Sequence, residues 1–381
     1  MTGERGLVVL QLVANRWWTG SADPVIQLSR GLEARGHRVL LGLVPGDRFE
    51  VKAREAGFPP LDGLSLEARR APLAALRDLT RLRRLVRTER VDIIHTHHSH
   101  DHWLGLFCRG RAALVRTFHS ARAVDARWPA TRLYRRSDAL IAVSDEIAAR
   151  CRETGAGADR VFRVAGVTDV ARFSRPAEGE RIRKEFELGA APVVGCVARL
   201  APRRGHEALI RGFALLLASY PDARLLLAGK GEMRSPLEAL VHDLGLVRQV
   251  LFTGYRDTDL PAVLDAMDVF ALMGAGSDES CRAALEAMAA GRPVVARRVG
   301  ALGEAVIHGA TGLLLDDDRP QSVAGALRAL LDDPDRARAM GEAGRQRACA
   351  VFAPERHAAR IESVYRHAIQ RATPRTRGAP G

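Results

Sequence analysis

The chain has few cysteines, few aromatic residues and no long apolar run, and each shortage excludes a class of protein. Its five cysteines are odd in number, widely spaced and never arranged as CxxC, which favours reduced thiols in the cytoplasm over a disulfide framework or zinc site. Only 5% of the residues are aromatic and no nucleic-acid-binding module is visible, so we expect no nucleic-acid partner. No apolar run is long enough to cross a bilayer, and LVVLQLVA near the start is interpreted as a buried strand rather than a signal peptide.

Arginine is abundant instead, and the formal net charge is +13. Such a surplus suits partners that carry phosphate groups or anionic lipid headgroups. Residues 69–90 hold eight arginines against Asp78 and Glu89, and the apolar spacing predicts an amphipathic helix over residues 71–88. The sequence leaves two interpretations of this helix open: an ordinary solvated outer face, or a surface that lies against the anionic headgroups of a membrane.

Predicted strands and helices alternate along the chain. The predicted strands span residues 6–14, 37–44, 91–95, 113–118, 139–143 and 161–164, and then 192–197, 223–228, 250–253, 269–272 and 293–296. With 381 residues the chain is longer than one core usually accommodates, so we expect two domains. Alternation of this kind is typical of βαβ units with parallel sheets, and it predicts an α/β fold of two doubly wound, Rossmann-like domains that face a cleft. The predicted bounds are 1–170 for the first domain, 171–190 for the connection, 191–353 for the second domain, 354–372 for a helix that crosses back, and 373–381 for a disordered tail.

Residues 274–296, GAGSDESCRAALEAMAAGRPVVA, contain the strongest indication of a binding site. A turn rich in Gly and Ser carries Asp278 and Glu279 and leads into a predicted helix, whose N-terminus suits a phosphate group. Glu286, further along that helix, could accept hydrogen bonds from a sugar or ribose diol. An ordinary crossover helix with solvated acids is the alternative.

Histidines gather after the strand predicted at residues 91–95. Their spacing matches no known zinc-ligand pattern and no cysteine lies nearby, so we expect no metal site and interpret the segment as a polar loop that opens the next helix. His119 ends the strand predicted at residues 113–118, where parallel sheets often bind ligands. Its position leaves a structural and a functional role equally open.

Nine segments in a fixed order together resemble the retaining glycosyltransferases of family 4, and the whole resemblance runs from about Leu7 to Tyr365. They are WTGSADPVIQLSRGLEARGHRV, VDIIHTHHSHDHWLG, VRTFHS, ALIAVSDEI, VGCVARLAPRRGHEALIRGF, LLLAGKGE, VLFTGYRD, LDAMDVFALM and DESCRAALEAMAAGRPVVARRVGALGEAVIHGATGLLL. The resemblance implies the GT-B fold, with an acceptor-side N-terminal domain and a C-terminal domain that binds a nucleotide sugar.

The resemblance also implies three catalytic residues. Arg199 and Arg204 match the basic pair that grips the donor diphosphate, although the family usually has lysine at the second position. His119 matches the histidine that lies near the transferred sugar. Gly20 matches the glycine loop on the phosphate side, which here reads TGSAD instead of a Gly-Gly pair.

Donor-binding residues follow from the same resemblance. Glu286 is similar to the glutamate that binds the nucleotide ribose. Asp278 stands where the family has a glutamate on the donor sugar, and because Asp is one methylene shorter, Glu279 is the alternative. The backbone that faces the phosphates would be that of Ser280, Cys281 and Arg282.

The function implied is a metal-independent retaining glycosyltransferase of the hexosyl or a related class, with a nucleotide-sugar co-substrate and no other cofactor. Its acceptor would be a hydroxyl group of a glycan or lipid-linked molecule in lipopolysaccharide, polysaccharide or glycolipid synthesis. The alternatives are a nucleotide-sugar epimerase or hydrolase on the same fold, and a non-catalytic relative that binds a nucleotide sugar or a membrane. We expect a cytoplasmic protein that makes peripheral contact with the inner face of the cell membrane.

Overall fold

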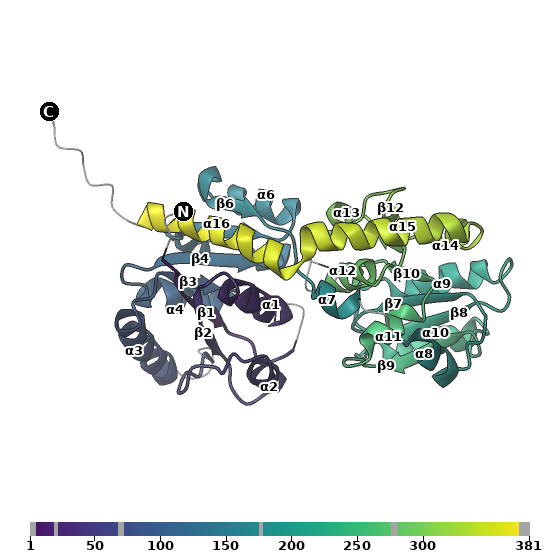
Figure 1. Ribbon diagram of the computed structural model, residues 1–381, viewed down its shortest axis with the longest axis horizontal. Helices are drawn as coiled ribbons and strands as arrows, with labels where there is room; N and C mark the ends of the chain where they lie inside the picture. Colours follow the sequence, from purple (N-terminus) through teal and green to yellow (C-terminus); the bar gives the residue numbers. More distant parts are fainter. Residues whose placement is uncertain (1–4, 19–21, 68–71, 175–177, 276–280, 373–381) are drawn as a thin grey trace. The chain divides into compact units, whose positions relative to one another are not determined.

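The computed structural model describes residues 5–18, 22–67, 72–174, 178–275 and 281–372. The chain divides into two compact units: residues 1–167 together with 354–381, and residues 168–353 (Figure 1). The segment 171–190, predicted as a connection, falls within the second unit, and helix α16 (Pro354–Ala372) is grouped with the first. Residues 373–381, predicted as a disordered tail, lie outside the described part of the chain.

The first unit contains a six-stranded parallel sheet in the order β2-β1-β3-β4-β5-β6. Its strands are short apolar runs, which is typical of parallel strands covered on both faces, and all six lie where the sequence predicts a strand. The predicted doubly wound α/β class is therefore confirmed for this unit. The bounds are β1 (Val8–Val13), β2 (Arg38–Leu43), β3 (Ile93–Thr96), β4 (Ala113–Phe118), β5 (Ala139–Ala142) and β6 (Val161–Arg163).

Helices cover both faces of this sheet (Figure 1). Because successive side chains of a strand point to opposite faces, Val9 packs with α1 (Ala22–Glu33) and α16, whereas Leu10 packs with α3 (Pro72–Thr88) and α4 (Ser99–Cys108). These layers hold β1, β3 and β4 at the centre of the unit. The remaining helices are α2 (Arg48–Glu55), α5 (Ala130–Arg135) and α6 (Asp145–Glu153).

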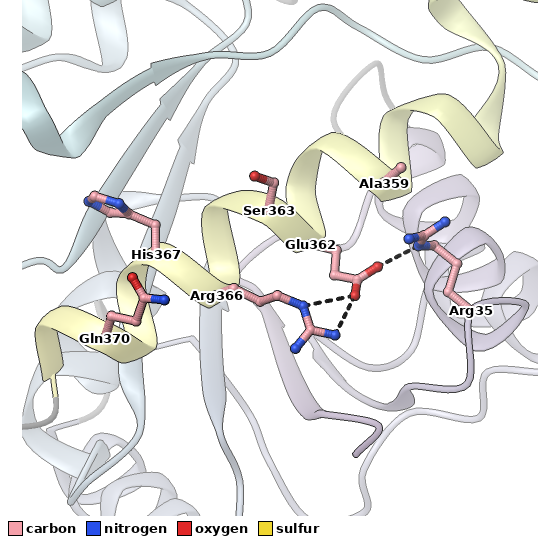
Figure 2. Close-up of a pocket in the computed structure, with 7 residues that line it drawn as sticks. All are labelled: Arg35, Ala359, Glu362, Ser363, Arg366, His367 and Gln370. Carbon is pink, nitrogen blue, oxygen red and sulfur yellow. Dashed lines mark hydrogen bonds and ion pairs between the residues drawn. The ribbon is translucent and has the colours of Figure 1, made fainter. Parts of the chain in front are cut away.

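A charged cluster fixes α16 against the end of α1. Glu362 accepts hydrogen bonds from Arg35 Nε at 2.5 Å and from Arg366 Nη2 at 2.6 Å (Figure 2). His37 Nε2 lies 3.4 Å from the same carboxylate, whose side chain is only 10% exposed. The C-terminal helix is thus joined by side-chain contacts to a segment more than three hundred residues earlier in the sequence.

The second unit repeats the architecture with a parallel sheet in the order β12-β11-β10-β7-β8-β9. Five of its strands lie where the sequence predicts them, but β12 was missed because its sequence, GLLL, begins with glycine, which is depleted in strands, and leaves only three apolar residues. The strand bounds are β7 (Val193–Val197), β8 (Arg224–Ala228), β9 (Val250–Gly254), β10 (Val269–Leu272), β11 (Val294–Arg297) and β12 (Gly312–Leu315).

Helices also flank this second sheet. Where α9 meets α14 the backbones approach closely, since a Cβ added to Gly212 would lie 2.6 Å from the Cβ of Val323. The bounds are α7 (Val170–Phe173), α8 (Gly179–Glu185), α9 (His206–Leu216), α10 (Arg234–Asp243), α11 (Leu260–Asp265), α12 (Arg282–Ala289), α13 (Leu302–Ala305), α14 (Pro320–Leu331) and α15 (Pro334–Arg347). Among the helices that the structure describes, none combines the length and apolar character needed to cross a membrane.

Candidate functional site

Arg199 stands just beyond the carboxyl end of β7, in a loop that lies against the end of β8. Ala198 N–H donates to the carbonyl of Ala228 at 3.0 Å. A Cβ on Gly229 would lie only 1.9 Å from the carbonyl oxygen of Ala198, so only glycine permits this approach. Arg199 Nη2 pairs with Glu232 at 2.9 Å, and both side chains are more than half exposed. The guanidinium is therefore held at the sheet edge and stays accessible to a ligand.

Arg204 is held by a tight contact between the β7–α9 loop and the segment after β10. Gly205 has φ 75° at the start of α9, and a Cβ there would lie 2.4 Å from the Cβ of Met273. Arg204 Nη1 donates to the carbonyl of Ala275 at 3.3 Å. Because β7 and β10 are neighbouring strands of one parallel sheet, Arg199 and Arg204 lie at the same carboxyl edge as the start of α12.

His206, the first residue of α9, is buried beside this edge. Burial and, next, the positive charge of Arg204 lower the pKa of His206 to about 4. It therefore adds no charge near neutral pH, and the arginines supply the positive field. His206, Lys230 and Glu232 were not predicted as site residues. Lys230 and Glu232 belong to the segment GKGE, which directly follows a predicted strand at the same edge.

Helix α12 opens with an unusual backbone at Cys281, which is buried and has φ 55°. The left-handed conformation turns the chain sharply into the helix, and the positive end of the helix dipole lies at the carboxyl edge of the sheet, beyond β10. One turn into α12, Glu286 is 5% exposed, and its Oε1 lies 3.3 Å from Arg282 Nε. A positive helix end beside a buried carboxylate suits a ligand that carries both phosphate and hydroxyl groups.

His119 belongs to the first unit, at the carboxyl end of β4. Its ring stacks on that of His97, with centroids 5.4 Å apart, and its Nε2 lies 3.1 Å from His97 Nδ1. Its Nδ1 is buried and has no hydrogen-bond partner in the described part of the chain. Burial and, next, the charge of Arg116 lower the pKa of His119 to about 4, so the imidazole is neutral at pH 7.

The histidine-rich segment is a set of buried side-chain hydrogen bonds that begins helix α4. His95 contacts Tyr365 and Thr117, each at 2.7 Å, and His102 Nδ1 lies 2.7 Å from the Thr96 hydroxyl. The described residues contain no group of three or more His, Cys, Asp or Glu side chains that could hold a metal ion. Gln11, which also contacts this segment, was not singled out in the sequence, because its role depends on strand pairing.

The residues predicted from the sequence fall into three groups. One edge of the second unit's sheet brings together Arg199, Arg204, Cys281, Arg282 and Glu286. His119 lies in the first unit. The other predicted residues lie outside the described residues, and they are Gly20, Asp278, Glu279 and Ser280.

Some curated relatives match about half of the chain, and others match most of it. The chain spans about half the length of the GDP-mannose-dependent alpha-(1-6)-phosphatidylinositol monomannoside mannosyltransferase of Mycobacterium tuberculosis, at 39% identity over 198 residues that cover 50% of this chain and 51% of that protein. It is 33% identical over 372 residues to the D-inositol 3-phosphate glycosyltransferase of Corynebacterium urealyticum, covering 89% of this chain and 86% of the relative.

Solved structures share the fold. Anabaena Alr3699/HepE in complex with UDP-glucose superposes with a TM-score of 0.81 at 22% identity, covering 94% of this chain and 98% of that one. A glycosyltransferase from Rickettsia africae superposes with a TM-score of 0.84 at 17% identity, covering 96% and 100%. Residues 19–172 match the family description "Glycosyltransferase Family 4" and residues 178–347 match "Glycosyl transferases group 1". The chain therefore belongs to glycosyltransferase family 4, the group 1 glycosyl transferases, and has their GT-B fold.

Proposed function

We propose that the protein transfers a hexose or related sugar from a nucleotide-sugar donor to a hydroxyl group of an acceptor, with retention of anomeric configuration. One observation carries the proposal: Arg199, Arg204, the N-terminus of α12 and the buried Glu286 gather at the carboxyl ends of the neighbouring strands β7 and β10. This edge offers positive charge to a diphosphate and a carboxylate to a diol. A nucleotide sugar carries both groups.

The two arginines would act on the leaving group. When the bond between the sugar and the diphosphate breaks, negative charge develops on the diphosphate oxygen, and fixed guanidinium groups stabilise that charge. Since two arginines can supply this stabilisation, we propose that transfer needs no divalent cation. His119 would contact the transferred sugar from the first unit.

The comparisons support a hexose donor without identifying its base. HepE was solved with UDP-glucose, whereas the mycobacterial mannosyltransferase is named as dependent on GDP-mannose. The relatives also act on an inositol phosphate and on a phosphatidylinositol mannoside. We therefore propose a polyhydroxylated acceptor, either free or linked to a lipid, in the synthesis of a glycolipid or polysaccharide.

A surface of the first unit supports a lipid-linked acceptor. The α3 outer face consists of side chains that lie on one side of a helix with 3.6 residues per turn: Leu73, Leu76, Arg77, Arg84 and Arg87. Leu73 is 78% exposed and Leu76 is 60% exposed. None of these three arginines pairs with a carboxylate among the residues that the structure describes. Exposed leucines followed by unpaired arginines suit an anionic membrane surface, so we propose a cytoplasmic protein in peripheral contact with the membrane.

The test combines donor binding with product analysis. Thermal shift and calorimetry against UDP-, GDP-, ADP- and dTDP-sugars, without added metal, should reveal one stabilising donor. The double variant Arg199→Ala/Arg204→Ala should then lose nearly all transfer to inositol- or mannose-containing acceptors. Unchanged transfer would overturn the leaving-group role. Isomerised or hydrolysed sugar in the absence of acceptor would favour an epimerase or hydrolase, and binding without turnover would favour a non-catalytic protein.

A further inference from the structure

A line of buried side chains in the first unit connects helix α1 to His119. Gln11 Nε2 donates to the Ser29 hydroxyl at 3.1 Å, and Gln11 Oε1 lies 2.9 Å from His97 Nε2. His97 Nδ1 in turn lies 3.1 Å from His119 Nε2. Gln11, Ser29 and His97 are all buried, at 5% exposure or less. The line ends at His119 Nδ1, the buried atom that has no partner among the described residues.

The direction of each hydrogen bond between these side chains follows from the hydrogen bond that Ser29 makes within helix α1. Ser29 lies 2.7 Å from the carbonyl of Val25, one turn earlier in α1. A carbonyl only accepts, so the single hydroxyl proton of Ser29 is used there, and the Ser29 oxygen must accept from the amide NH₂ of Gln11. The amide orientation of Gln11 is thereby fixed, with its oxygen turned toward His97.

The tautomers of the two histidines follow from the orientation of Gln11. Because the Gln11 oxygen only accepts, His97 must carry its proton on Nε2. Burial and, next, the neighbouring His95 lower the pKa of His97 well below its ordinary value, so the ring is neutral and its Nδ1 is an acceptor. His119 must then donate from Nε2 to His97 Nδ1, and in the neutral ring of His119 the remaining nitrogen, Nδ1, holds a lone pair.

We propose that Ser29, Gln11 and His97 are positioning residues that hold His119 as the tautomer protonated on Nε2, so that its Nδ1 accepts a hydrogen bond from a hydroxyl group of the transferred sugar. The inference rests on the proposed function for the presence of a sugar, but the tautomer itself rests only on this network. A buried acceptor without a partner is costly in the free protein, and a ligand hydroxyl would remove that cost. The site would therefore select a group that donates a proton over one that only accepts.

A neighbouring pair of hydrogen bonds provides a matched control. His95 lies between the Tyr365 hydroxyl and the Thr117 hydroxyl, at 2.7 Å from each. Its ring lies tilted against that of His97, with centroids 4.4 Å apart, but it takes no part in the series of hydrogen bonds that ends at His119. Tyr365→Phe removes one buried hydroxyl from this second network and leaves Ser29, Gln11 and His97 intact.

The first experiment determines the tautomer without any ligand. A long-range ¹H–¹⁵N correlation spectrum of the full chain labelled with ¹⁵N-histidine distinguishes a protonated from an unprotonated ring nitrogen, and His119→Asn assigns the signals of His119. We expect His119 Nδ1 unprotonated in the wild type and in Tyr365→Phe, and a mixture of tautomers in Gln11→Leu. A proton on His119 Nδ1 in the wild type, or an unchanged tautomer in Gln11→Leu, would overturn the inference.

The second experiment examines the hydroxyl contact with UDP-glucose and GDP-mannose analogues in which each hexose hydroxyl in turn is replaced by hydrogen or fluorine. Fluorine does not donate, so at one position both analogues should bind the wild type about 10- to 100-fold more weakly than the parent donor. In Gln11→Leu this difference should shrink while affinity for the bare nucleoside diphosphate is kept. A fluoro analogue that binds as well as the parent at every position would overturn the contact. If no nucleotide sugar of the donor screen binds, the proposed function fails together with the sugar contact, while the spectrum still decides the tautomer.

Discussion

Arg282 Nε lies 3.3 Å from Oε1 of Glu286, one turn further along α12, and only 7% of the Glu286 side chain is exposed. The pair joins the start of the helix, where phosphate would bind, to the carboxylate proposed for the ribose. Both proposed donor contacts in this segment therefore belong to one rigid turn of helix. We therefore expect a substitution of either side chain to change the position of the other.

We expect Glu286→Gln to weaken donor binding by about 10- to 100-fold, because a neutral amide accepts more weakly from a ribose diol than a carboxylate does. Calorimetry with the donor found in the screen measures the change. The control is Glu238→Gln, which removes an exposed carboxylate paired with Arg234 on α10 of the same unit and should leave affinity unchanged. Equal affinities of Glu286→Gln and the wild type would refute the role of Glu286.

At Arg204 we expect the positive charge of the side chain to affect kcat more than its shape does. Arg204→Lys, which restores the residue more usual in the family, should keep kcat within about tenfold, whereas Arg204→Gln should lower it by about 100-fold or more. Initial rates at saturating donor separate the two variants. Arg211→Gln, on the exposed side of α9 and paired there with Glu207, is the matched control. A similar loss of kcat in the Lys and Gln variants would indicate that kcat depends on the geometry of the arginine side chain rather than on its charge.

Much of the fold could be predicted because it depends on local pattern. The predicted bounds of β4, β10 and α16 agree with the structure, since the two strands are mostly apolar and α16 is a long amphipathic stretch. Strand β12 begins with a glycine, and helix α4 begins with a serine, histidines and an aspartate, so neither has a strong pattern. These elements form because neighbouring elements supply their contacts.

The site could be predicted only in part, for a similar reason. Arg199, Arg204 and Glu286 lie in segments that resemble the family. The network behind His119 depends instead on the register that pairs β1 with β3, in which Gln11 lies opposite His95. His97 and Gln11 are 86 positions apart in the sequence. No periodicity within either segment indicates that they touch.

The cluster around Glu362 makes a prediction about stability. Burial raises the pKa of Glu362, but hydrogen bonds from Arg35 and Arg366 (Figure 2), together with the nearby His37, outweigh it and hold the pKa at about 2. Because the folded-state pKa lies below the ordinary value of 4.5, this stabilisation is complete above pH 4.5 and is lost as the pH falls toward 2. Glu362→Gln should therefore lower the free energy of unfolding of the first unit by about 1–3 kcal/mol at pH 7 and by less at pH 3.

Hydrogen exchange in α1 and α16 is the measurement for this variant, since it reports on the first unit alone. Glu342→Gln, which removes an exposed carboxylate paired with Arg345 on α15 of the second unit, is the control and should leave these helices unchanged. A destabilisation by Glu362→Gln that is equally large at pH 3 and pH 7 would contradict the assignment to the carboxylate charge.

The α3 outer face predicts salt-dependent binding to vesicles. Each basic residue near an anionic surface contributes about 1 kcal/mol, so Arg77→Gln, Arg84→Gln and Arg87→Gln together should weaken binding to phosphatidylglycerol vesicles by about 100-fold at low salt. Sedimentation of the full chain at low and high salt measures this. The control removes the same charge from exposed arginines of the second unit, at Arg328, Arg336 and Arg338. Equal losses in the two triple variants would show that net charge, not this face, governs binding.

Buried histidines predict that the first unit is more sensitive to acid than the second. Burial lowers the pKa of His95 to about 3 and is the largest cause that lowers those of His98, His119 and His357 to about 4, from an ordinary value of 6.5. In the folded chain these rings stay neutral as the pH falls from 6.5 to about 4, whereas in the unfolded chain they take up protons. Each therefore lowers the free energy of unfolding by about 1.4 kcal/mol per pH unit over that range.

In the same unit, Asp101 raises the free energy of unfolding as the pH falls, which is opposite to the effect of the histidines. Burial raises its pKa to about 7 against the backbone hydrogen bonds that it accepts, so the folded chain takes up one proton between pH 7 and about 4 that the unfolded chain does not. The buried histidines of the first unit still outweigh one aspartate. In the second unit His206 is the only described histidine whose pKa is comparably lowered. The first unit should therefore lose several times more free energy per pH unit than the second.

Hydrogen exchange from pH 7 to pH 4.5, corrected for intrinsic rates, separates the units by comparing β1, β3 and β4 with β7, β8 and β10. His357→Gln should reduce the pH slope of the first unit by about 1.4 kcal/mol per pH unit, because it removes one of the buried histidines that take up a proton only on unfolding. His242→Gln, at a side chain that is 82% exposed in the second unit, should change neither slope. Equal acid sensitivity of the two units would mean that the buried histidines of the first unit take up protons without unfolding.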